Sequence, residues 1–151
     1  MNSQIIKKNR QDGFTLVELI IVVALITIIS AMSVAFYSRF LTQNAVANTV
    51  DQLVGEFRKA QLYSMMGRQN GTWGVAYNSN KIQLFQGNTF ATRNTAFDES
   101  FSVNTNISIT GFTELTFTKA TGTPSASPTI TVAGNNNTKI ITINSLGVIS
   151  R

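Results

Sequence analysis

Apolar residues dominate one long segment near the start of the chain. Residues 14–38, FTLVELIIVVALITIISAMSVAFYS, are apolar on every face and contain a single charge, Glu18. As a helix this segment would measure about 37 Å at about 1.5 Å per residue, enough for a hydrocarbon core of about 30 Å. Three basic residues precede it and Arg39 follows it. The pattern predicts a single pass through the inner (cytoplasmic) membrane, with the N terminus cytoplasmic and the rest extracytoplasmic.

A cleaved secretory signal is the alternative for this segment. The small residues Ser33, Val34 and Ala35 resemble a signal-peptidase site, and the basic start also fits. However, the apolar core of a signal peptide normally spans about 7–15 residues and carries no acid. The length of the segment and the presence of Glu18 therefore favour a retained membrane helix.

Beyond Arg39 the helical period continues in amphipathic form. Apolar positions recur at steps of three and four, which predicts one buried stripe on a helix over residues 39–66. Gly67 is the expected stop. The members of the stripe are Val46, Val50, Leu53, Phe57 and Ala60, with Val54 widening it.

After Gly67 the period changes to that of β-strands. Residues 72–77 and 82–85 flank the turn 78–80 and predict a hairpin. Phe101, Val103, Ile107 and Ile109 alternate with polar residues, with a break at Thr105. Further strands are predicted at 112–118, 129–132, 139–143 and 147–149, with a turn at 134–137. The expected fold class is α+β: a long N-terminal helix, transmembrane then amphipathic, packed on an antiparallel β-sheet domain.

The chain has 151 residues, enough for one modest domain, and its composition excludes several types of catalytic and metal site. Cysteine and histidine are absent, which excludes disulfides, Cys/His zinc sites and histidine acid–base catalysis. Asp98 and Glu99 are adjacent, so on a strand they would point to opposite faces, away from a shared site with Glu114. We therefore expect no enzyme activity, no catalytic residue, no metal and no cofactor.

Glu18 lies four residues inside the apolar segment and needs an explanation. A carboxylate at the centre of a membrane helix costs about 2.5–3.5 kcal/mol, and less near an interface. Glu18 could simply reach the headgroups. If the chain were cut after Gly13, Glu18 could instead pair with the free amine of Phe14 in a neighbouring copy. The residues alone leave both interpretations open.

A short motif lies between the basic leader and the apolar helix: Gly13-Phe14-Thr15-Leu16-Val17-Glu18. This motif resembles that of the type IV prepilins, a class that includes pilins and type II secretion pseudopilins. The resemblance implies cleavage between Gly13 and Phe14, N-methylation of Phe14 and a role of Glu18 in assembly. It divides the chain into a leader (1–13), a transmembrane half-helix (14–38), an amphipathic half-helix (39–66) and a globular β-domain (67–151).

The distal chain is similar to the H-type (GspH) minor pseudopilins and the FimT-like minor pilins. The similarity rests on the strand start Trp73-Gly74-Val75 and on segments 114–117, 129–132 and 141–149. It implies a minor subunit whose partners are other pilin or pseudopilin subunits, the prepilin peptidase and methyltransferase, inner-membrane lipid and the assembly platform. The cysteine pair of many major pilins has no counterpart here. The calcium site of the major pseudopilin is also missing, since no Asp or Glu follows Glu114.

Two other functions remain in competition with a filament subunit. The net charge is +5, but most basic residues are scattered, so only Lys119, Lys139 and Arg151 are candidates for DNA contact by an uptake pilin. A lone membrane-anchored β-domain would share the helix without requiring cleavage after Gly13 or pairing through Glu18. The sequence favours the filament subunit.

Overall fold

The computed structural model describes residues 13–134 and 137–151, with all of their side chains except those of 33–36, 38, 39, 41 and 42. The chain divides into two compact units, Met1–Ser38 and Arg39–Arg151. Helix α1, Leu16–Met65, has 50 residues and contains parts of both units. The expected leader 1–13, apart from Gly13, lies outside the described residues.

The predicted helix stop at Gly67 is confirmed. Gly67 has a left-handed φ of 61°, and its N–H donates to the Ser64 carbonyl at 3.0 Å, which satisfies one of the last helical acceptors. A short 3₁₀ helix, η1 (Arg68–Asn70), follows and was not predicted. Buried Ser64 also accepts the Trp73 N–H through its hydroxyl at 2.9 Å. This bond holds the first strand against the helix end.

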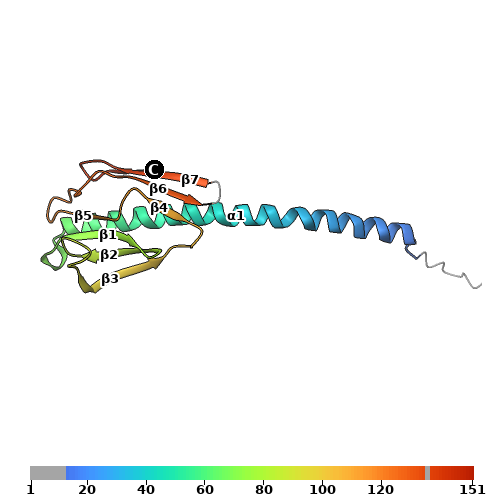
Figure 1. Cartoon of the computed structure of the whole chain (residues 1–151), viewed down its shortest axis with the longest axis horizontal. Coiled ribbons are helices and arrows are strands. Elements are labelled where there is room, and N and C mark those ends of the chain that lie inside the picture. Colours follow the sequence, from blue (N-terminus) through green and yellow to red (C-terminus); the bar gives the residue numbers. More distant parts are fainter. Residues whose placement is uncertain (1–12, 135–136) are drawn as a thin grey trace, which may run out of the picture. The chain divides into compact units, whose positions relative to one another are not determined.

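The predicted antiparallel β-domain is confirmed (Figure 1), and in the described residues its eight strands form two four-stranded sheets. The first sheet has the order β3-β2-β1-β5 and the second the order β4-β6-β7-β8. The bounds are β1 Trp73–Asn78, β2 Lys81–Gln86, β3 Asn94–Ser102, β4 Ser108–Thr110, β5 Glu114–Phe117, β6 Thr129–Gly134, β7 Asn137–Ile143 and β8 Ile149–Ser150.

The predicted hairpin is confirmed as β1 and β2. Asn78 pairs with Lys81, which leaves a two-residue turn. Both turn residues, Ser79 and Asn80, have positive φ, as the tight hairpin turn requires. The turn predicted at 134–137 includes residues 135–136, which lie outside the described part, although Gly134 does pair with Asn137.

The alternating run from Phe101 to Ile109, in which the sequence shows a break at Thr105, belongs to two strands. β3 ends at Ser102 and β4 begins at Ser108, and the two belong to different sheets. Val103 and Ile107 are both buried because the chain crosses between the sheets at this point. The start of β3 at Asn94 was missed. β3 is an edge strand whose first three residues are exposed, so no apolar alternation marks its start.

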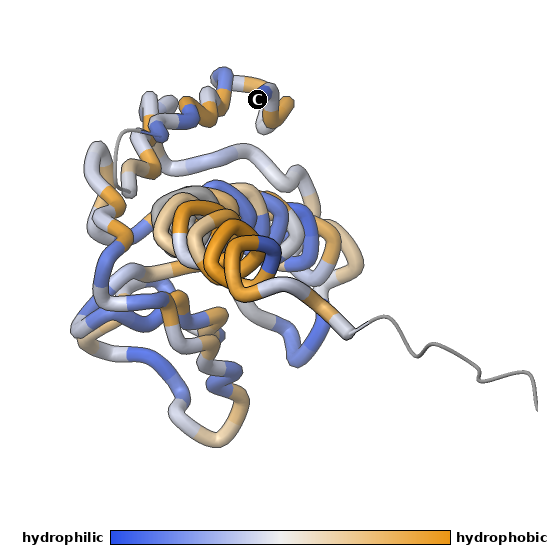
Figure 2. The backbone as a smooth tube through the Cα atoms, turned by 90° about the vertical axis from the view of Figure 1, so that its right-hand side faces the viewer, coloured by the Kyte–Doolittle hydropathy of each residue, from blue (hydrophilic) through white to orange (hydrophobic). Residues whose placement is uncertain are grey.

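The predicted stripe on the second half of α1 forms the centre of the core in Arg39–Arg151. Val46, Leu53, Phe57 and Ala60 are fully buried, and the core cluster joins them to residues of both sheets. Figures 1 and 2 show this part of the helix between the two sheets. The Phe57 ring meets the Phe112 ring edge-on at 5.3 Å between centroids.

Two glycines in Arg39–Arg151 differ sharply in their surroundings and provide a matched stability test. A Cβ on Gly74 would lie 2.7 Å from the Leu115 carbonyl oxygen, whereas a Cβ on Gly55 would meet nothing within 4 Å. We expect Gly74→Ala to destabilise the domain by about 1–3 kcal/mol through overpacking. Gly55→Ala should stabilise it by up to about 1 kcal/mol through helix propensity. Thermal and urea unfolding followed by circular dichroism measure both, and wild-type unfolding of Gly74→Ala would contradict the close strand contact.

Candidate functional site

The first turn of α1 is held by a reciprocal hydrogen-bonded cap. The Glu18 N–H donates to the Thr15 hydroxyl at 3.2 Å, and the Thr15 N–H donates to Glu18 Oε2 at 3.3 Å. The Thr15 carbonyl accepts the Leu19 N–H, so Thr15 is the N-cap and Glu18 is the third helical residue. This arrangement is a capping box, and its sequence signature Thr-x-x-Glu is present at residues 15–18.

The cap directs the Glu18 carboxylate back toward the chain that enters the helix. Oε2 is shared by the N–H and the hydroxyl of Thr15, both at 3.3 Å. A negative charge at a helix N-terminus is also favoured by the helix dipole. Beside Glu18, a groove of about 280 Å³ is lined by apolar surface of Phe14, Glu18, Leu19, Val22 and Val23. Glu18 therefore presents an acceptor next to Phe14 without leaving its own helix.

Apolar side chains surround this acceptor on all sides of the helix. Every large apolar side chain between Leu16 and Met32 is more than half exposed within Met1–Ser38. Figure 2 shows the corresponding turns of α1 mostly in the hydrophobic colour. Exposed apolar surface on this scale marks a site of protein or membrane contact. Among the described residues, no helix is both long enough and apolar enough to cross a membrane.

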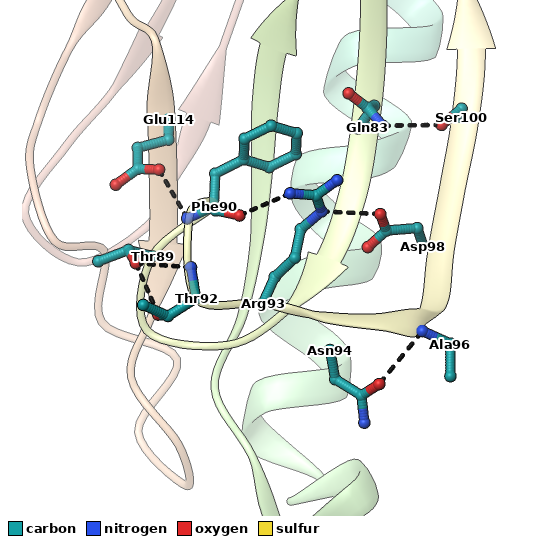
Figure 3. Close-up of polar contacts among 10 residues, drawn as sticks. All are labelled: Gln83, Thr89, Phe90, Thr92, Arg93, Asn94, Ala96, Asp98, Ser100 and Glu114. Carbon is teal, nitrogen blue, oxygen red and sulfur yellow. Dashed lines mark hydrogen bonds and ion pairs between the residues drawn. The ribbon is translucent and has the colours of Figure 1, made fainter.

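The three carboxylates considered for catalysis bind three different partners. Asp98 accepts the Arg93 Nε–H at 2.7 Å, Glu114 accepts the Phe90 N–H at 2.8 Å, and Glu99 pairs with Lys59 at 2.5 Å. Figure 3 shows Arg93 holding Asp98 while Glu114 binds the loop before β3. The described residues include no group of three or more Asp or Glu side chains arranged to hold a metal. Each carboxylate has a structural partner that accounts for its position.

The three cations considered for DNA contact do not lie together. Lys119 bonds the Asn70 side chain just beyond the end of α1. Arg151 pairs with Asp51, which lies on α1 about 21 Å before that end at about 1.5 Å per residue. Lys139 and Arg151 line the same groove, and Lys119 does not.

Glu56 is a buried acid that sequence analysis did not single out. It lies on the buried side of α1 and is only 5% exposed, and Gln52 donates to its Oε1 at 2.9 Å. Its Oε2 has no hydrogen-bond partner among the described residues. Burial raises the pKa of Glu56 and the Glu99 carboxylate adds to this, whereas Lys59 and the Gln52 bond act in the opposite direction. An acid at a stripe-flanking position is the only sequence signal that could have revealed it.

Glu56 should make the stability of the domain depend on pH. Because its folded pKa is raised, its contribution is fully present below the ordinary value of 4.5 and is lost as pH rises through the raised pKa. We therefore expect Glu56→Gln to be more stable than wild type at neutral pH, with a flatter stability profile above pH 4.5. Urea unfolding across this range measures the difference. The matched variant Glu114→Gln removes an exposed carboxylate, so the difference between the two variants reports the burial of Glu56. A wild-type profile for Glu56→Gln would contradict the assignment.

Comparison with known proteins identifies the first part of the chain. The helix packed on an antiparallel β-domain is consistent with the α+β fold of pilins. Residues 8–34 match the family described as the prokaryotic N-terminal methylation motif, which is the signal of type IV pilins and pseudopilins. No curated protein and no solved structure matches the chain significantly. The motif supports a pilin- or pseudopilin-like structural subunit and implies peptidase processing and assembly with other pilins.

Proposed function

We propose that this chain is a minor subunit of a type II secretion pseudopilus or a type IV pilus, of the H-type group. The observation that carries the proposal is the methylation motif at 8–34, together with the capping box that begins the helix inside it. The strand segments similar to H-type subunits support the choice of subgroup. In this role the protein assembles into an extracytoplasmic filament and catalyses no reaction.

Before assembly the subunit is held in the inner membrane by residues 14–38. The support is the sequence: 25 residues with one charge, preceded by a basic leader. The prepilin peptidase cleaves between Gly13 and Phe14, and the methyltransferase modifies the new Phe14 amine. The assembly platform then moves the subunit into a filament, where helices of neighbouring subunits cover the apolar surface of Leu16–Met32.

Glu18 provides the assembly contact in this proposal. Its carboxylate is already directed toward the start of the helix by Thr15, so the amine of a neighbouring Phe14 can approach without a rotamer change in Glu18. An ion pair in apolar surroundings is stronger than one in water, provided that both charges are satisfied. The pairing would set the axial stagger between subunits.

Replacing Glu18 in two ways separates the cap from the charge. Glutamine at this position can still complete a capping box, whereas alanine removes both the cap and the charge. We expect both Glu18→Gln and Glu18→Ala to insert in the membrane and to be processed, and both to be lost from filaments. Immunoblots of membrane and sheared-filament fractions measure this. Normal incorporation of Glu18→Gln would show that the charge is not used and would overturn the pairing.

Processing after Gly13 has a direct test. Intact mass and N-terminal sequencing of the membrane form should show a chain that begins at methylated Phe14. Gly13→Ala should accumulate the unprocessed chain, because the residue before the cleaved bond is changed, whereas Gly55→Ala should be processed normally. A wild-type chain that begins at Met1 would indicate a permanently anchored domain, and one that begins after Ala35 would indicate a cleaved secretory signal.

A further inference from the structure

The outer edge of β7 is open over half of its length. In the second sheet β8 pairs only with Thr142 and Ile143 of β7. The Ile143 N–H donates to the Pro128 carbonyl, on the side of β6. Because backbone groups of successive residues alternate between the two sides of a strand, those of Thr138 and Ile140 point to the side of β8. No strand of the described residues pairs with them there.

A groove lies beside this open edge. It has a volume of about 590 Å³ and runs between β7 and the second half of α1. Its lining combines apolar and charged groups: Ala47, Val50, Asp51, Thr138, Lys139, Ile140 and Arg151. Ile140 is 53% exposed although it lies in the middle of a strand. The edge of β7 therefore combines unpaired backbone donors and acceptors with the exposed side chain of Ile140 and a groove that has room for a peptide.

Lys139 of β7 places a positive charge in the groove, on the face of the sheet that is turned toward α1. Lys139 is opposite Val132, a fully buried residue, so the Lys139 side chain is on the helix-facing side of the sheet. Asp51 is occupied by its ion pair with Arg151. Lys139 forms no ion pair among the described residues, and its ammonium group is available to an acidic side chain.

We propose that this edge and groove bind an extended acidic peptide segment of a partner protein as an added strand. The segment would hydrogen-bond to the backbone of Thr138 and Ile140, and a carboxylate on its helix-facing side would pair with Lys139. β-Strand addition takes its affinity from main-chain bonds and its specificity from side chains in adjacent pockets. A peptide uses both the backbone edge and Ile140, whereas nucleic acid phosphates would use only the cations. The inference does not depend on the filament role.

The test uses the full-length chain in detergent micelles and a synthetic peptide of about six residues, a usual strand length, with alternating valine and threonine and one central aspartate. Fluorescence anisotropy should detect binding, and amide exchange by NMR should slow at Thr138 and Ile140. Lys139→Glu should weaken binding by about tenfold, or about 1.4 kcal/mol. The matched variant Lys119→Glu should not weaken it.

Three controls can overturn the proposal. The same peptide with N-methylated alternate residues cannot form the edge bonds, so undiminished binding would contradict strand addition, as would no binding of the original peptide. A short DNA duplex that competes with the same dependence on Lys139 would indicate a phosphate surface instead. Protection of Thr138 and Ile140 that grows with protein concentration, without peptide, would assign the edge to a second copy of this chain.

Discussion

Burial of one helical stripe is the constraint on which the domain depends. Among the described residues, no strand of one sheet pairs with a strand of the other. The helix joins them: Val46 packs beside Gly134 of β6, and the Phe57 ring contacts Phe117 of β5 at 6.5 Å between centroids. Truncating a buried Phe typically costs about 3–5 kcal/mol, a large share of the stability of a small domain. Each sheet thus depends on α1 for its apolar cover.

The other half of the same helix places its apolar groups outward and its one charged side chain, Glu18, near the start. Among the described residues of Met1–Ser38, nothing covers the large apolar side chains of Leu16–Met32, which are all more than half exposed. The capping box gives backbone N–H groups at the helix start a hydrogen-bond acceptor. Such groups are costly to leave unbonded where water is excluded. The capping box also gives the Glu18 carboxylate hydrogen-bond donors within its own helix. Capping and pairing are compatible, since a carboxylate accepts several hydrogen bonds.

Local patterns predicted the features that local physics determines. The stripe with Phe57, the stop at Gly67 and the hairpin turn at Ser79 and Asn80 follow from helical period, glycine at positive φ and turn length. The division into two sheets was missed because it depends on which strands meet in space. The alternation from Phe101 to Ile109 reads the same within one strand and across a sheet-to-sheet crossing. Of the candidate site, the sequence supplied Phe14 and Glu18, and the cap through Thr15 was overlooked.

The open edge of β7 differs from the other long free edge of the domain in how it is protected. On β3, Asp98 and Glu99 place charges along the edge strand, and the Lys59–Glu99 ion pair ties that strand to α1. Charged side chains on an edge strand are a common defence against adventitious strand pairing. β7 instead exposes Ile140 beside a groove and carries a single unpaired cation, Lys139. A groove lies between the edge strand and α1 at both edges, so the ammonium group of Lys139, which forms no ion pair among the described residues, and the exposed Ile140 distinguish the edge of β7.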